Sequence, residues 1–493
     1  MKHKLFRRLF SAFTVILLPL ILTAVLSCSA AGRDDSSLKN TDELSGKQAE
    51  NGDMHETGGT GRETASEKDK ETEGGTGFSA TMGLEPVEVD WESFRYVSVR
   101  AGSKFSNAAK AAGGNNWLLT IKISAEENVP ALSGRVRLSD PDEGKSRQYT
   151  INAAPPDQSL YFTKGSAGFF PSVITAEVEG PGRITAVLLK PDSLVSENLE
   201  EKITPVPADP GVILVYDESL WRRDDYELFS WSIIPEILLF DFRDYDIQRK
   251  YFARLAYFVG VAGESGRIEE ESYYEGRHVF NAHDYRPEDM ADFYNRIGEK
   301  GLSLNSEEEI LKQIALNNGI IKKENNKFLP GTGAILSVSR ETPSWLRRRL
   351  LAHEAMHGLF YVSEDFRNRC FALWETMSEE EQTYWKLFLG NKGRLDNRPF
   401  YTGYAIENHY LLVNEIVGHM MQLNRSEVNS YFLDIYLGRL ESLFPEKQAV
   451  FTSIRENTPE IFMNTRNAME GFLSDIFGLK NGSIFSVALD PSQ

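Results

Sequence analysis

The sequence of 493 residues contains only two cysteines, Cys28 and Cys370. Small secreted domains without a sufficient apolar core depend on several disulfide bridges, and two cysteines cannot form such a framework. The chain must therefore gain its stability from packed cores. Its 41% content of hydrophobic residues is enough to build such cores in two or three domains.

Basic residues are fewer than acidic ones. The chain has 54 Lys and Arg against 72 Asp and Glu, which gives a formal net charge of -18. A protein binds nucleic acid largely by neutralising phosphates with clustered positive charge. We therefore expect no nucleic-acid partner. No internal repeat is visible in the sequence.

The first 27 residues differ in kind from the rest of the chain. Lys2, Lys4, Arg7 and Arg8 precede an uncharged stretch, residues 9–27, which ends in small residues. This order is typical of an export signal, and we predict a signal peptide over residues 1–27. An uncleaved anchor helix is the alternative, since the apolar run is close to the shortest that spans a bilayer. Both interpretations place most of the chain outside the cytoplasm.

The stretch "VLSC", residues 25–28, resembles the lipobox of bacterial lipoproteins. The match is incomplete, because Val25 stands where Leu is commonest and Leu26 where a small residue is preferred. The resemblance implies that Cys28 is diacylated and becomes the new N-terminus. It also implies a lipid-anchored protein of the bacterial cell envelope, periplasmic or on the outer surface, whose Cys370 has no disulfide partner.

The predicted tether, residues 28–84, contains very few large apolar side chains. Between Ser29 and Gly77 they are Leu38, Leu44 and Met54. Such a stretch cannot bury enough surface to offset its ordering entropy, so we expect it to be disordered, with a mean reach of about 40 Å.

Residues 85–202 contain short runs of alternating apolar and polar residues, such as "WLLTIKIS" and "VITAEVE", separated by turn-forming segments. This pattern predicts an all-β sandwich or jelly-roll domain. Its role stays open between a module that binds carbohydrate or protein and a spacer.

Beyond the proline-rich boundary at residues 203–211 the pattern changes to helical periodicity. Residues 235–263, 286–298 and 306–319 are predicted as helices with short loops between them. We therefore predict a multidomain protein, in which an α+β, mainly helical domain over residues 212–493 follows the β-rich domain.

The stretch "LLAHEAMHGLF", residues 350–360, follows a predicted strand at residues 333–340. On a helix, His353 and His357 lie one turn apart on one face, where both imidazoles can reach one metal ion. Glu354 lies on the adjacent face, within reach of a water in the open position of a catalytic zinc site. This is the HExxH arrangement of zinc metallopeptidases.

The third ligand is predicted to be Glu415, in "ENHYLLVNEIVGHMMQL", residues 407–423. At helical spacing Glu415 shares a face with apolar residues. A buried carboxylate is costly unless it is paired or binds a metal.

HExxH followed by a separate helix with Asn-Glu resembles the gluzincins, the thermolysin-like branch of zinc metallopeptidases. The resemblance implies a zincin-like fold, with His353, His357 and Glu415 as zinc ligands and Glu354 as the general base. It also implies that the strand at residues 333–340 is the edge strand that aligns an extended peptide.

Other residues compete for roles in this site. The rival third ligands are Glu364, Glu407, His409 and His419. His419 stands where the thermolysin pattern has an aspartate beyond the ligand shell, and it is also a candidate partner of a ligand or a transition-state donor. The candidates for an oxyanion-stabilising tyrosine are Tyr401, Tyr404 and Tyr410, of which we choose Tyr404. His278 and His283 are expected to be loop or capping residues.

The expected activity is hydrolysis of a peptide or protein substrate. Zinc lowers the pKa of its bound water, and Glu354 takes up the proton and later delivers it to the leaving amine. The alternative is a zincin-like lipoprotein without activity that serves as a surface binding or structural protein, because a fold and a motif do not guarantee catalysis.

Overall fold

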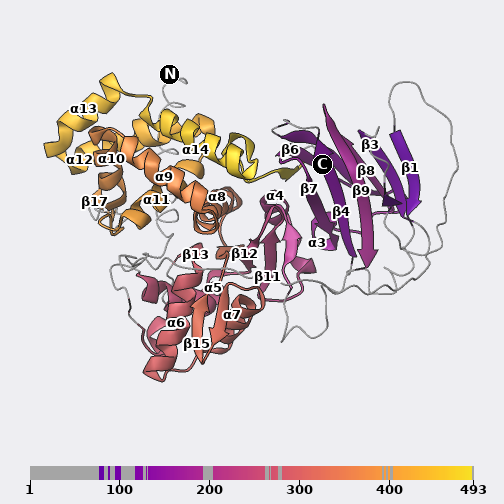
Figure 1. Ribbon diagram of the computed structural model, residues 1–493, viewed down its shortest axis with the longest axis horizontal. Helices are drawn as coiled ribbons and strands as arrows, with labels where there is room; N and C mark the ends of the chain where they lie inside the picture. Colours follow the sequence, from indigo (N-terminus) through magenta and orange to yellow (C-terminus); the bar gives the residue numbers. More distant parts are fainter. Residues whose placement is uncertain are drawn as a thin grey trace, which may run out of the picture.

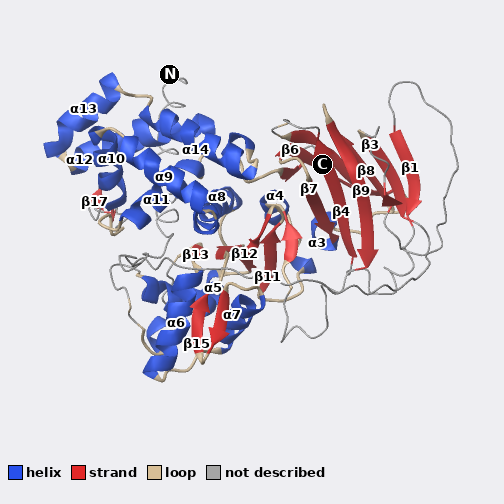
Figure 2. Ribbon diagram, viewed as in Figure 1, coloured by secondary structure: helices blue, strands red, loops and turns tan. Residues whose placement is uncertain are grey.

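The computed structural model describes residues 77–82, 87–88, 95–101, 117–125, 129, 131–191, 204–260, 266, 268–275, 280–390, 394–395, 398–399 and 404–490. The predicted signal peptide, Cys28, His278 and Tyr401 lie outside the described residues. Among the helices that the structure does describe, none combines the length and the apolar character needed to cross a membrane. A β-rich part of the chain is followed by a largely helical C-terminal part (Figures 1 and 2).

Two sheets form the N-terminal β-rich domain. The six-stranded sheet has the order β1 (Gly77–Met82), β3 (Tyr96–Ala101), β8 (Val173–Val178), β5 (Leu132–Asp140), β6 (Lys145–Ala154) and β19 (Val487–Leu489). The four-stranded sheet has the order β2 (Val87–Glu88), β9 (Gly182–Pro191), β4 (Trp117–Ala125) and β7 (Gln158–Thr163). Strand β5 buries every second residue, as a half-covered antiparallel strand should. Buried residues of both sheets belong to one apolar core.

Two strands differ from the predicted domain boundaries. Strand β1 lies inside the range 28–84 that we predicted as tether, and it pairs in parallel with β3. Strand β19 comes from residues 487–489, yet it pairs with β6 through Val487 and Ile151. The β-rich domain is therefore completed by a strand from the far end of the described chain, close to the labelled C-terminus in Figure 1.

A five-stranded sheet begins the C-terminal part. Its order is β10 (Val206–Ala208), β11 (Tyr226–Trp231), β12 (Ile234–Phe242), β16 (Ala334–Ser339) and β13 (His283–Tyr285). The prediction of a strand at residues 333–340 is confirmed, but the prediction that it is the edge strand is wrong. Strand β16 lies between β12 in parallel and β13 in antiparallel pairing, so β13 stands at this end of the sheet.

The predicted helix over residues 235–263 is also wrong in its first third, because β12 occupies residues 234–242. Both faces of this strand are covered. Leu238 and Phe240 pack into the core formed with helices α5 (Tyr245–Val259), α6 (Pro287–Lys300) and α7 (Ser306–Asn317). Ile237 and Leu239 pack into the large apolar core that joins buried residues of the two N-terminal sheets with those of the C-terminal helices. A strand buried on both faces has a continuous apolar run rather than an alternating one.

The α-helices that follow β16 in the chain form the C-terminal bundle. They are α8 (Ser344–Val362), α9 (Glu364–Thr376), α10 (Glu379–Gly390), α11 (His409–Met421), α12 (Leu437–Leu443), α13 (Gln448–Asn457) and α14 (Ile461–Phe477). Helix α8 contacts β12, β13 and β16 on one side and α11 on another. Gly358 allows the close approach to the sheet, because a Cβ there would lie 3.1 Å from Ile237 Cδ1. The helix is therefore held between the sheet and the bundle (Figure 2).

Candidate metal centre

Helix α8 buries the whole HExxH motif. His353 is 1% exposed, and Glu354 and His357 are fully buried. Leu346 and Leu350, which share the histidine face, are buried as the spacing predicts. This part of the helix is covered by the sheet and by α11, so the polar residues of the motif lie in the protein interior rather than at a surface.

Helix α11 brings Glu415 to the two histidines. The Asn408 side chain caps this helix by accepting a hydrogen bond from Leu411 N at 3.2 Å. One carboxylate oxygen of Glu415 lies 3.6 Å from His353 Nε2, and the other lies 3.9 Å from His357 Nε2. The three residues predicted as ligands therefore meet in space, although they come from two separate helices.

Gly418 allows α11 to approach α8 at this point. A Cβ at position 418 would lie 2.8 Å from His353 Cε1 and 2.9 Å from His357 Cε1. Both contacts are shorter than real Cβ atoms make. A side chain at this position would push the imidazoles out of place, so the glycine is part of the cradle that holds them.

His419 joins the same cluster from the next turn of α11. Its Nε2 lies 3.8 Å from a Glu415 oxygen, and its ring centroid lies 4.8 Å from that of His353. Gln422 Nε2 lies 3.3 Å from His419 Nδ1 in hydrogen-bond geometry. Potential ligand atoms of His353, Glu415 and His419 all lie within 4.8 Å of one another.

Strand β13 contributes Asp284, which our reading of the sequence missed. Potential ligand atoms of Asp284, Glu354 and His357 also lie within 4.8 Å of one another. The Tyr361 hydroxyl donates to Asp284 Oδ2, and Asn414 Nδ2 donates to that hydroxyl at 3.2 Å. This chain of hydrogen bonds ties the strand to α8 and α11. No local motif surrounds Asp284, and only the pairing of β13 with β16 brings it to the site.

Burial decides the protonation of two imidazoles of the cluster. It lowers the pKa of His353 to about 4 and the pKa of His419 well below 6.5, so both imidazoles are neutral at neutral pH. Burial also raises the pKa of Tyr361 well above 10, and the adjacent Asp284 carboxylate adds to this shift. Neutral imidazoles are the form that binds metal ions.

Three rival ligands lie away from the cluster. Glu364 and Glu407 are exposed, and His409 lies at the surface with its Nε2 3.6 Å from Glu375. Of the predicted tyrosines, Tyr404 has its ring 6.3 Å from that of His419. Tyr410 packs against Phe360 instead, with ring centroids 5.2 Å apart.

His283 is buried on β13, where its Nδ1 lies 2.9 Å from the Tyr285 hydroxyl. It is thus a strand residue, and the prediction of a loop or capping role for it is wrong.

The donor set fits a zinc ion. Neither ring nitrogen of His357 has a hydrogen-bond partner within the part of the chain that the structure describes, although both are buried. Such a nitrogen is costly in a protein interior unless it binds something. Imidazole nitrogens with one carboxylate are a common catalytic zinc set.

Comparisons with models of protein families, with curated proteins and with solved structures found no match for this chain.

Proposed function

We propose that this protein is a membrane-tethered zinc metallopeptidase of the bacterial cell envelope, with a gluzincin-like site. The observation that carries the proposal is the position of Glu415. Its carboxylate oxygens lie 3.6 Å and 3.9 Å from the Nε2 atoms of the two HExxH histidines. A buried carboxylate between two imidazoles is costly unless it binds something, and the two imidazoles have the spacing of a metal-binding motif.

The roles follow from where each side chain stands. His353, His357 and Glu415 would hold the zinc ion, and Glu354 would act as the general base. Bound zinc supplies a Lewis acid that lowers the pKa of a water molecule and polarises a carbonyl group. The Glu354 carboxylate takes one proton from the attacking water as its oxygen bonds to the scissile carbon. It returns that proton to the amine nitrogen as the carbon–nitrogen bond breaks.

The substrate is an extended peptide, and β13 is the strand that would align it. This strand stands at the end of its sheet and carries Asp284 beside Glu354 and His357. An extended peptide can add to such a strand through backbone hydrogen bonds. The diacylated Cys28 and the tether would hold the folded part close to a membrane.

A second candidate function has its own observation in favour of it. His419 adds a fourth potential ligand, and the whole cluster is at most 1% exposed. Four protein ligands close a zinc site, as in structural zinc sites. In that case the protein would be a zincin-like binding or structural lipoprotein without peptidase activity.

The test uses the full-length protein, its zinc content and its action on a peptide library. We expect about one zinc ion per chain and cleavage of some peptides. Glu354→Gln should keep the zinc and lose about 10²–10⁴-fold in cleavage rate, because the proton acceptor is removed. Glu364→Gln, at an exposed glutamate of the next helix, is the matched control and should cleave normally.

A wild-type protein without zinc contradicts both functions. Normal zinc with no cleavage of any peptide favours the second candidate. In that case His419→Ala, which opens the fourth position, should create slow cleavage.

A further inference from the structure

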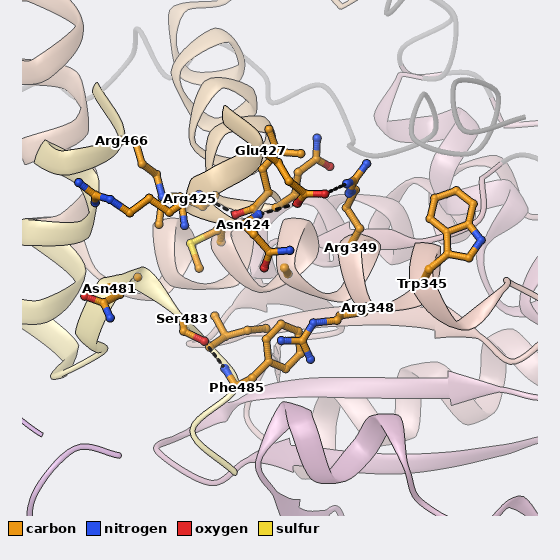
Figure 3. Close-up of a pocket in the computed structure, with 17 residues that line it drawn as sticks. Trp345, Arg348, Arg349, Asn424, Arg425, Glu427, Arg466, Asn481, Ser483 and Phe485 are labelled. Carbon is orange, nitrogen blue, oxygen red and sulfur yellow. Dashed lines mark hydrogen bonds and ion pairs between the residues drawn. The ribbon is translucent and has the colours of Figure 1, made fainter. Parts of the chain in front are cut away.

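A cavity of about 520 Å³ opens beside the N-terminal half of α8 (Figure 3). We call it the arginine pocket, because four guanidinium groups line it: Arg348, Arg349, Arg425 and Arg466. They come from α8, from the 3-10 helix η4 (Arg425–Glu427) and from α14. Trp345 and Phe485 add aromatic surface to its walls.

Two acids compensate only part of this charge. Arg349 Nη2 donates to Glu427 Oε1 at 3.1 Å. Arg425 and Arg466 share Glu470, with distances of 2.5 Å and 2.8 Å to its two oxygens. Four guanidinium groups therefore face two carboxylates, which leaves the pocket positive on a chain whose formal net charge is -18.

Arg466 is the fixed element of the pocket. It is 4% exposed, and its Nη1 donates to Met420 O at 2.7 Å and to Leu423 O at 2.9 Å. These carbonyls lie in the last turn of α11 and just beyond its end, so Arg466 stabilises the wall as well as contributing charge. Its position does not depend on a ligand.

Arg348 is the element available to a ligand. Figure 3 shows the Arg348 side chain beside the Phe485 ring. The guanidinium carbon lies 3.8 Å from the ring centroid, and the Arg348 side chain is exposed. Within the described residues, no carboxylate lies in ion-pair contact with it. Asp209 acts on it only through its more distant charge. A guanidinium that stacks on a ring keeps its donor edge directed outward in a defined plane.

We propose that the arginine pocket binds a small oxyanion, a carboxylate or phosphate group, on a ligand whose apolar part lies against Trp345, because Phe485 is buried and its ring is covered by Arg348. A planar guanidinium matches both kinds of oxyanion with two parallel hydrogen bonds. Trp345 is 45% exposed at the rim, which is unusual for so large an apolar side chain. Charge and exposed aromatic surface therefore occur together at this one cavity.

The pocket is separate from the metal centre but borders it. Gln422 lines the pocket and contacts His419, and Ala352 and Met356 line it from α8 next to the histidines. None of the three predicted zinc ligands lines the pocket. The proposal therefore stands whether or not the protein is a peptidase.

The test is calorimetric titration of the full-length protein with inorganic phosphate and with phenylacetate, and with phenylacetamide as the uncharged control. We expect phosphate, phenylacetate or both to bind, and phenylacetamide to bind at least tenfold more weakly. The ligand that binds more tightly identifies the preferred oxyanion. Arg348→Gln should weaken binding at least tenfold, whereas Arg135→Gln, at an exposed arginine of β5, should leave it unchanged.

A second variant guards against a loss caused by misfolding. Glu427→Gln removes the carboxylate that competes for Arg349, so binding should become several-fold tighter. Thermal unfolding shows that each variant is folded. The proposal is overturned if neither anion binds, if phenylacetamide binds as well as phenylacetate, or if Arg348→Gln binds as tightly as the wild type.

Discussion

Two buried carboxylates along α8 have different surroundings. Asp241 of β12 is fully buried, and its Oδ2 accepts from Arg347 at 2.5 Å and from Arg340 at 2.7 Å. Glu415 is equally buried but is surrounded by three imidazoles at 3.6–3.9 Å.

Guanidinium groups are always charged, so the charge facing Asp241 is permanent. Burial lowers the pKa of His353 and His419 so that both are neutral at neutral pH, and the charge that these two imidazoles present to Glu415 depends on what they bind. The first arrangement serves folding, and the second suits a metal ion.

The strongest test of this contrast removes the carboxylate of Glu415. In Glu415→Gln we expect zinc affinity to fall by more than about 100-fold, because a direct ligand should contribute at least as much as its outer-shell partners do. Competition with a chelating dye measures the affinity. The increase in Tm that zinc gives the wild type should disappear in the variant.

Asp241→Asn is the matched control. It leaves the buried Arg347 and the half-buried Arg340 facing a neutral amide, so the free energy of unfolding should fall by about 3–5 kcal/mol while the folded fraction still binds zinc. If Glu415→Gln kept normal zinc affinity, or if Asp241→Asn lost it, the contrast between the two carboxylates would be wrong.

A smaller effect is expected from Gly418→Ala. The added methyl group meets two imidazole rings at less than 3 Å, so the metal-free protein should lose about 1–3 kcal/mol of stability. Zinc affinity should fall with it, because the histidines are displaced. Urea unfolding and the same dye competition measure both quantities.

Gly438→Ala in α12 is the control, since nothing lies within 4 Å of a Cβ there. The free energy of unfolding of this variant should rise by up to about 1 kcal/mol, because alanine has a higher helix propensity than glycine. Equal effects of the two substitutions would show that neither stability nor zinc affinity depends on the close approach of α11 to α8.

Asp209 is a third buried carboxylate, and its protonation makes the stability of the fold depend on pH. Asp209 accepts hydrogen bonds from Gly211 N at 2.8 Å and from Ser486 N at 3.1 Å, and burial raises its pKa to about 7. Between the ordinary value of 3.8 and about 7, the folded state keeps a proton that the unfolded state has released. Its contribution to stability is therefore complete below the lower value and is lost as the pH rises through this window.

Asp209→Asn should remove this dependence. The wild type should lose up to about 1.4 kcal/mol per pH unit relative to the variant within the window. Urea unfolding at several pH values gives the difference. A difference that does not change with pH would mean that Asp209 stays ionised in the folded protein.

The candidate ligands could be picked out in the sequence because their spacing depends on local helix geometry. His353 and His357 lie one turn apart in any helix, and Glu415 stands out as a carboxylate on an apolar helix face. That α8 and α11 pack together, and that Glu415 rather than Glu364 or His409 meets the histidines, is a matter of tertiary packing. The prediction of Glu415 used its apolar helix face and the family resemblance, and neither shows how two helices pack.

Other features could not be predicted because they depend on chain segments far apart in sequence. Strand β12 was predicted as helix, since an apolar run covered on both faces lacks the alternation that indicates a strand. Asp284 reaches the site only because β13 pairs with β16, which also moves the edge of the sheet away from residues 333–340. Gly418 matters only once two helices face each other.

Strand β19 makes the order of events during biogenesis matter. Synthesis from the N-terminus produces residues 77–191 long before residues 487–489, and until then β6 lacks β19 as its neighbour. Pairing across so large a sequence separation is slow, and until it happens the edge of β6 can pair with other chains. The β-rich domain is therefore complete only once residues from the far end of the described chain have joined its six-stranded sheet.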